Sequence, residues 1–443
     1  MLPWPPMTTA PPAPIGRPSI FDRLLRPFTD VRPGEGAAAA LMLLSLFLLL
    51  IGYYVLKTVR EPLILASGRP ELASYSAAGQ AVVLIGFIPL FGWFASRVPR
   101  LTLVVATIAF FIVCIELFYL AVAADVPYVG IVFFIWLGIF NNATIALFWS
   151  FANDVYSREA GERLFPMIAI GATAGSPLGA LAAGKLFEAG FKSHQMFHIT
   201  AALLIVHLIL YVAVDRKRQG SGAGRAAPPP PLPGPGGFAL TLRSPYIRLI
   251  ALLLVVLNLV NSNGEYLIRS YVTEAAKGTA DPTAFIGSFA GQYQFWVAVS
   301  ALVLQAFVVS RIVKHLGIAG VVLIPAFLSL GNYGLTAAGV GFAIFRWTKT
   351  AENASDYSIM NTAKQLLWLP TTRAEKYKAK QAVDTFFVRL GDVVSAAGVF
   401  VAVTWLGLGV RGFGMLNTLF VAVWLAIALK LLKGHRKLCL ECD

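Results

Sequence analysis

Residues 36–57 read GAAAALMLLSLFLLLIGYYVLK, an apolar run with no charged side chain before Lys57. A helix needs about 20 mostly apolar residues to cross the hydrocarbon core of a bilayer. Runs of the same kind follow as far as Leu432. Hydrophobic residues make up 57% of the chain, charged residues only 13%, and the mean hydropathy is +0.72. The sequence therefore predicts an all-α integral membrane protein with many spans.

The apolar runs and the breaks between them predict about twelve transmembrane helices. The segment GSGAGRAAPPPPLPGPGG, residues 220–237, cannot span a membrane and is typical of a flexible cytoplasmic linker. The predicted parts are an N-terminal cytoplasmic tail (1–35), a six-helix bundle (36–218), the linker (219–243), a second six-helix bundle (244–433) and a C-terminal tail (434–443). The predicted spans are 36–57, 73–95, 101–124, 127–150, 164–187, 195–215, 246–268, 285–310, 316–337, 338–364, 382–407 and 412–432.

The two predicted bundles repeat a short pattern at the ends of their first spans. YVLKT at 54–58 matches YLIRS at 266–270 in the order aromatic, two aliphatics, cation and hydroxyl. Duplicated bundles with a site at their interface are a known design of secondary transporters. GWFASRVPR at 92–100 resembles the major facilitator loop motif Gly-x-x-x-Asp-Arg-x-x-Arg, with Ser96 in place of the aspartate. The sequence predicts a major facilitator-like fold of two pseudo-symmetric bundles.

The formal net charge of +14 fits a membrane topology signal better than nucleic-acid binding. With the N-terminus in the cytoplasm, roughly 24 cations fall on the cytoplasmic side and roughly five on the other, as the positive-inside rule requires. Both termini are therefore expected in the cytoplasm, and the features are typical of a bacterial inner membrane. A single chain can hold a complete pathway, so a monomer would suffice.

The sequence lacks the motifs of membrane enzymes and of metal sites. It has no His-Glu-x-x-His, no paired Asp-rich motif and no nucleophile elbow. Cys439 and Cys442 form a Cys-x-x-Cys pair without further zinc ligands. The run from Gly179 to Lys185 fits most of a phosphate loop, but Leu186 replaces the required Ser or Thr. We expect no catalytic residue, no metal and no cofactor, so uphill transport would be driven by a gradient or by exchange.

The first span ends with Lys57, Arg60 and Glu61, which share one helical face. Pro62 follows, and it should break or kink the helix because it cannot donate to the carbonyl of Thr58. A broken helix beside two cations is a plausible anion site. The alternative is an ordinary snorkelling helix end, in which Glu61 is a local partner of the cations.

The seventh span holds Glu265 and Arg269, preceded by a run of small and polar residues from Asn258 to Gly264. One interpretation is an intrahelical ion pair near the outer surface. The other is a cavity wall with a loosened helix.

The tenth span carries the longest polar stripe. Arg346, Lys349, Asn353, Asp356 and Met360 follow the helical rhythm, and the stripe is flanked by Glu352 and Lys364. Charges are rarely kept inside spans, so the stripe must face protein or water. A cavity lining is favoured over a purely structural pairing of Arg346 and Lys349 with Glu352 and Asp356.

Further polar groups lie in other spans. Asp154, near the end of the fourth span, could form a gate salt bridge or be an interfacial charge, and the eleventh span has a comparable set in Asp384, Arg389 and Asp392. In the fifth span Gly171, Gly175 and Gly179 recur every four residues, which is typical of a close helix-packing face.

Several buried cations together fit a multiply charged anion better than a neutral sugar, because Arg and Lys recognise phosphate and carboxylate. The residues predicted to gate the pathway or couple it to an ion are Glu61, Asp154, Glu352, Asp356, Asp384 and Arg389. Those predicted to bind substrate are Lys57, Arg60, Glu265, Arg269, Arg346, Lys349 and Lys364.

Several of these segments resemble the ATP/ADP translocase family of plastids and intracellular bacteria. YVLKTVRE at 54–61 is similar to that family's first-span pattern, and FAND at 151–154 to its Phe-Ala-Asn-Glu segment. NTAKQ at 361–365 resembles its Asp-Pro-Thr-Lys-Glu segment. QAVD at 381–384 and RLG at 389–391 look like its Ala-Val-Asp and Arg-Leu-Gly run.

The resemblance implies a twelve-helix major facilitator-type fold and nucleotide exchange, commonly ATP for ADP. It also implies roles for Lys57 or Arg60, Asp154, Glu265 and Lys364. The family pattern has Asp where this chain has Asn361 and Glu where it has Asp154. Two alternatives remain open: a proton-coupled carrier of another organic anion, and a non-transporting membrane protein.

Overall fold

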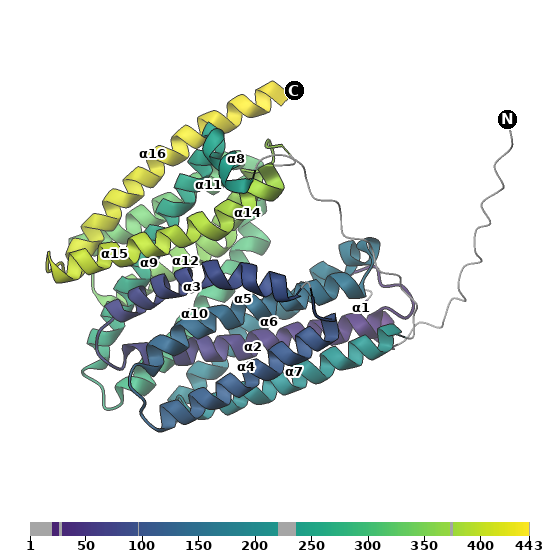
Figure 1. Cartoon of the computed structure of the whole chain (residues 1–443). Coiled ribbons are helices and arrows are strands. Elements are labelled where there is room, and N and C mark those ends of the chain that lie inside the picture. The colour runs from purple at the N-terminus through teal and green to yellow at the C-terminus, as the bar shows by residue number, and fades with distance from the viewer. Residues whose placement is uncertain (1–19, 26–28, 96, 220–235, 373–374, 443) are drawn as a thin grey trace, which may run out of the picture.

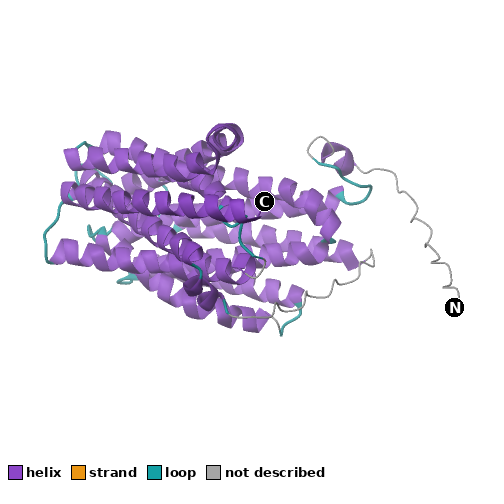
Figure 2. Cartoon of the chain, turned by 90° about the horizontal axis from the view of Figure 1, so that it is seen from above, coloured by secondary structure: helices purple, strands orange, loops and turns teal. Residues whose placement is uncertain are grey.

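The computed structural model describes the chain except for residues 1–19, 26–28, 96, 220–235, 373–374 and 443. Every regular element in the described part is a helix, as Figure 2 shows. Ten of these helices are long and apolar enough to cross a membrane. The prediction of an all-α multi-pass membrane protein is therefore confirmed.

The first half of the chain forms α1 to α7, in which α1 is a short helix and the other six are long. Their bounds are α1 Ile20–Leu25, α2 Gly36–Leu65, α3 Glu71–Ala95, α4 Arg100–Ala123, α5 Val129–Val155, α6 Arg158–Glu188 and α7 Gln195–Gln219.

The second half contains long helices interrupted by π-helical turns, labelled η. Their bounds are α8 Gly237–Arg243, α9 Pro245–Ala276, α10 Pro282–Val303, η1 Leu304–Val308, α11 Val309–Ala338, α12 Phe342–Ser355, η2 Asp356–Met360, α13 Asn361–Leu366, η3 Glu375–Ala379, α14 Lys380–Ala382, η4 Val383–Phe387, α15 Val388–Thr404 and α16 Val410–Cys442. The predicted linker lies largely outside the described residues, and its last part, 237–243, forms the helix α8, which packs on η3 and α9.

The difference between the ten candidate spans and the predicted twelve has two sources. One of the ten, Pro282–Ala338, is a continuous stretch of 57 residues that turns at Gly317, where φ is +60° and ψ is −155°. The predicted tenth span corresponds to α12, η2 and α13, which carry too many charges to be among the ten. The number twelve and the cytoplasmic position of the termini stay predictions.

The buried apolar side chains form two clusters. One contains only residues between Leu25 and Val214, and the other contains residues between Tyr246 and Leu431 with four additions from the first half. The additions are Ile64, Leu65, Ala73 and Phe134. The clusters parallel the two predicted bundles, whose boundaries remain a prediction. Figure 1 shows α3 beside α15, and α10 beside α6, where the two halves meet.

The glycines of α6 pack this helix tightly onto α2. A Cβ atom at Gly171, Gly175 or Gly179 would lie 2.4–2.7 Å from the carbonyl oxygens of Leu43, Phe47 and Ile51. Only hydrogen at these positions allows the two backbones to approach so closely. The helix-packing face predicted from the glycine spacing is confirmed.

The two ends of the bundle differ in how the halves meet. We call the end with loops 66–70, 189–194 and 277–281 the outer end, towards the left of Figure 1, and the opposite end the inner end. At the outer end a Cβ on Gly291 would lie 2.5 Å from the Cα of Gly184, and the rings of Tyr75 and Phe400 are 6.2 Å apart. The halves are therefore in contact there.

Towards the inner end, a cavity of about 390 Å³ separates α3 from α14, η4 and the start of α15. Its lining includes Ile85 and Ile88 of α3 on one side and Gln381, Thr385 and Arg389 on the other. The halves are thus closed together at the outer end and parted here.

Candidate functional site

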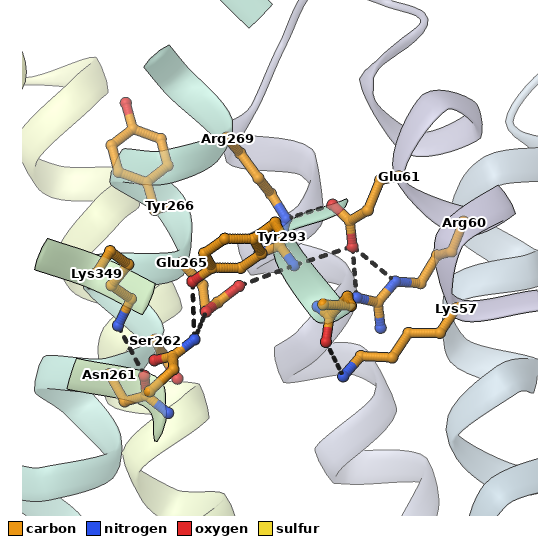
Figure 3. Close-up of polar contacts among 12 residues, drawn as sticks. Lys57, Arg60, Glu61, Asn261, Ser262, Glu265, Tyr266, Arg269, Tyr293 and Lys349 are labelled. Carbon is orange, nitrogen blue, oxygen red and sulfur yellow. Dashed lines mark hydrogen bonds and ion pairs between the residues drawn. The ribbon is translucent and has the colours of Figure 1, made fainter. Parts of the chain in front are cut away.

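A carboxylate lies between two arginines where the halves meet in the outer third of the bundle (Figure 3). Glu61 of α2 accepts hydrogen bonds from Arg269 of α9, at 2.8 Å from Nε and 3.2 Å from Nη2. It also accepts from both Nε, at 3.0 Å, and Nη2 of its neighbour Arg60. All three side chains are nearly buried. Glu61 therefore joins the two halves through a charge-assisted, bidentate contact.

A second layer extends this ion network into the second half. Glu265 lies 3.7 Å from Arg269 and accepts a 2.8 Å hydrogen bond from the amide of Asn353. The same amide also lies 2.8 Å from the Tyr293 hydroxyl. Glu61, Glu265, Arg269 and Tyr293 line a cavity of about 30 Å³. This space suffices for a water molecule or two but not for a nucleotide.

Lys57 makes the other polar contact between the halves at this level. Its Nζ donates to Oε1 of Gln294 on α10 at 3.0 Å and lies 5.1 Å from the centroid of the Tyr54 ring. No carboxylate among the described residues lies within 4.0 Å of Lys57. Lys57 is half-buried. It is therefore a cation at the interface whose hydrogen-bond partner, the Gln294 amide, is neutral.

Lys349 is fully buried inside the second half, away from that interface. Its Nζ donates to Asn261 Oδ1 at 2.9 Å and lies 3.4 Å from Glu352. Glu352 in turn accepts hydrogen bonds from Asn332 and Tyr333 of α11, at 2.7 and 2.8 Å. This arrangement matches the structural pairing considered for Lys349 and Glu352 rather than the cavity lining that was favoured.

Replacing Lys349 by methionine is expected to destabilise the protein while leaving the contacts between the halves in place. The change would leave Glu352 as a buried charge without its cation, a defect that costs about 3 kcal/mol or more. Thermal unfolding of the purified protein would measure it. A double replacement with Glu352→Gln should recover part of the loss, and unchanged unfolding of the single variant would contradict the pairing.

The remaining cations of the predicted stripe differ in their partners. The guanidinium of Arg346 lies over the rings of Phe289 and Trp347, at 5.4 and 5.0 Å, and has no carboxylate within 4.0 Å among the described residues. Lys364 pairs with Asp356 at 3.4 Å, and both are about a quarter exposed. The structural pairing that was considered as the alternative for Arg346, with the acids of its own helix, is therefore not observed among the described residues.

The predicted gate residues lie at scattered positions. Arg389 pairs with Asp392 at 3.4 Å, and Asp392 also accepts from Asn258 and Ser262 of α9 at 2.8 Å. Asp384 is exposed, and Asp154 is half-buried near the end of α5. Both acids lie towards the inner end of the bundle, whereas Glu61 and its network lie towards the outer end of α2.

The helix break expected at Pro62 was wrong, and of the two interpretations of the seventh span the loosened helix is not observed. Pro62 does not break α2, which continues to Leu65, because less than one turn follows the proline and few hydrogen bonds are at stake. The polar run in α9 does not loosen the helix either, because its side chains bond to neighbouring helices instead. Besides the contacts of Asn258, Asn261 and Ser262, Asn263 bonds to Asn417 of α16 and Ser395 of α15. The side chains of Cys439 and Cys442 lie outside the described part.

Three residues of the site were not singled out by sequence reasoning for the contacts they make. Gln294 holds Lys57, Asn353 bridges Glu265 and Tyr293, and Tyr293 lines the small cavity. In the sequence, Gln294 stands out only as an uncharged polar residue within an apolar stretch. Many glutamines with a purely structural role have the same surroundings.

The sequence was compared with protein-family models and with curated proteins. No protein-family model matches the sequence. The chain is 22% identical over 214 residues to ADP,ATP carrier protein 1 of Chlamydia pneumoniae, covering 43% of this chain and 41% of the relative. It is 23% identical over 302 residues to ADP,ATP carrier protein 4 of Rickettsia bellii, covering 58% and 56%. The chain therefore spans about half the length of the curated relatives that it matches.

Solved structures extend the likeness over nearly the whole chain. The nucleoside transporter NupG superposes with a TM-score of 0.64 at 14% identity, covering 89% of this chain and 98% of NupG. An auto-inhibited peptide transporter of the POT family gives 0.66 at 11% identity, covering 90% and 97%. The fold is that of a major facilitator-type transporter. The predicted resemblance to ATP/ADP translocases and the predicted major facilitator-like fold are both confirmed.

Proposed function

We propose that this transporter exchanges nucleotides, ATP against ADP, by alternating access. The observation that carries the proposal is the meeting of Lys57 and Arg60 of α2 with Arg269 of α9 at the interface between the halves. Cations at such an interface suit a phosphorylated anion. Sequence similarity to ADP,ATP carrier proteins supports nucleotide as the substrate among anions of this class.

Contacts between the halves support the alternating-access part of the proposal. The halves touch through Gly184 and Gly291 at the outer end and are parted between α3 and α14 to α15 nearer the inner end. Rocking of one half against the other would reverse this arrangement and expose the Lys57 region to the other side. Closure of the outer end by the Glu61 network would prevent leakage while substrate enters from the inner end.

The test is uptake of labelled ATP into proteoliposomes that contain ADP or are empty. Uptake that requires internal ADP is the expected result. Uptake into empty vesicles that follows an imposed pH gradient would replace exchange by proton-coupled transport. If correctly folded and oriented protein takes up no ATP under either condition, nucleotide is not the substrate.

Lys364 provides a test of the proposed binding residues. Lys364→Ala is expected to abolish ATP uptake without altering thermal unfolding, because the side chain is partly exposed and its ion pair with Asp356 contributes little to stability. Lys380→Ala is a matched control, since Lys380 is a nearby cation that is also partly exposed and donates to the neutral side chain of Gln365. Normal uptake by the Lys364 variant would remove this residue from the site.

A further inference from the structure

The cations around the interface differ in whether a carboxylate already neutralises them. Arg60 and Arg269 share Glu61, Lys349 is paired with Glu352, and Lys364 with Asp356. An anionic ligand that approached any of these would have to displace or tolerate a carboxylate. Lys57 and Arg346 are the two predicted substrate cations for which the described residues supply no such partner.

Of these two, Lys57 lies between the halves. The ring contacts of Arg346 all belong to the second half, with Phe289 of α10 and Trp347 of α12. Lys57 of α2, in contrast, donates to Gln294 of α10 across the interface. A bond from an ammonium to a neutral amide oxygen is weaker than its bond to a phosphate oxygen, so a phosphate can take this partner's place.

The Lys57 to Gln294 bond also helps to hold the outer end shut. Other polar contacts between the halves in this region, among the described residues, include Glu61 with Arg269, Tyr75 with Thr404, and Glu188 with Ser288 and Gln292 at the rim. Displacing Gln294 from Lys57 would therefore remove one of the few polar bridges that must break before the outer end opens.

We propose that Gln294 is a neutral placeholder for the substrate phosphate: it binds Lys57 while the site is empty, and substrate binding releases it and so permits the outer end to open. The inference rests on the proposed nucleotide exchange and deepens it, because it gives a reason why the empty carrier would not change state. Exchange would be obligatory since only an anion on Lys57 releases the bond between the halves.

The test compares Gln294→Leu and Gln294→Glu with the wild-type chain. Leucine cannot accept a hydrogen bond, so ATP should bind about fivefold more tightly, and labelled ATP should enter vesicles that contain no ADP. Glutamate would form an ion pair with Lys57, so binding of ATP and exchange should both fall at least tenfold. Binding is read from the shift in unfolding temperature with added ATP, and transport from proteoliposome uptake.

Two controls isolate the contact with Lys57. Gln292→Leu removes a hydrogen bond between the halves two residues away without touching Lys57, so ATP affinity should not change. In a Lys57→Gln background, the Gln294→Leu replacement should have no effect on ATP affinity, because the coupling between the two positions is lost.

The outcomes separate this inference from the proposed function. If the wild-type chain binds no ATP, the proposed substrate fails. If the wild-type chain binds and exchanges ATP while Gln294→Leu neither tightens binding nor permits uptake into empty vesicles, the placeholder role of Gln294 is overturned and the exchanger stands.

Discussion

Replacing Glu61 by glutamine is expected to destabilise the protein and to abolish nucleotide exchange. Two arginines, Arg60 and Arg269, share this carboxylate in a nearly buried position, and without it they would repel each other across the interface. Breaking a buried ion pair from one side typically costs about 3–5 kcal/mol. Thermal unfolding and ATP exchange of the Glu61→Gln protein would measure the two effects.

Glu188 offers the matched comparison. It also accepts hydrogen bonds across the interface, from Ser288 and Gln292, but it is about a third exposed. Glu188→Gln should therefore cost at most about 1 kcal/mol. Adding Arg269→Gln to the Glu61 variant should restore part of its stability, because the unpaired cation is then removed. A Glu61→Gln protein that unfolds and transports like the wild type would show that this network does not hold the halves together.

Replacing Gly291 by leucine is expected to stop exchange by preventing closure of the outer end. A Cβ atom there would already lie 2.5 Å from the Cα of Gly184 and 2.6 Å from the carbonyl oxygen of Ala180, so a leucine must push α10 away from α6. Because this contact joins the halves rather than elements within one half, each bundle should still fold.

The effect can be read at the outer end itself. A cysteine introduced at Ser288 should react faster with a membrane-impermeant maleimide in the Gly291→Leu protein than in the otherwise wild-type chain, and ATP exchange should fall below detection. Gly334→Leu is the control, since a Cβ at Gly334 meets no atom within 4 Å. Equal labelling and normal exchange in the Gly291 variant would mean that the outer end closes by other contacts.

Features of the fold that depend on local pattern could be predicted from the sequence. The apolar runs predict long helices, and the four-residue glycine spacing in the fifth span predicts the face that packs on α2. The close packing of α6 on α2 depends on the small size of glycine, and the residue types can be read directly from the sequence. The break expected at Pro62 was wrong, because α2 continues through the proline to Leu65.

The partners of the charged side chains could not be predicted in the same way. Lys57 and Gln294 are 237 positions apart, and Glu61 and Arg269 are 208 apart, so only the tertiary packing of the halves brings them together. The polar stripe of the tenth span identifies the buried charges, but a single helix cannot reveal that Lys349 is enclosed by Asn261 and Tyr333. The sequence shows which residues are charged, but the partner of each charged side chain depends on the tertiary structure.

The π-helical turns affect how this chain should be aligned with its relatives. All four in the described part, η1 to η4, lie in the second half. Each inserts one residue relative to a regular α-helix, and one residue corresponds to a rotation of about 100°. A relative with a regular helix at the same place would need a single-residue gap inside a span. Without that gap, every predicted site residue after η2 or η4 in the same span, Lys364 and Arg389 included, would be matched to a neighbour on the wrong face.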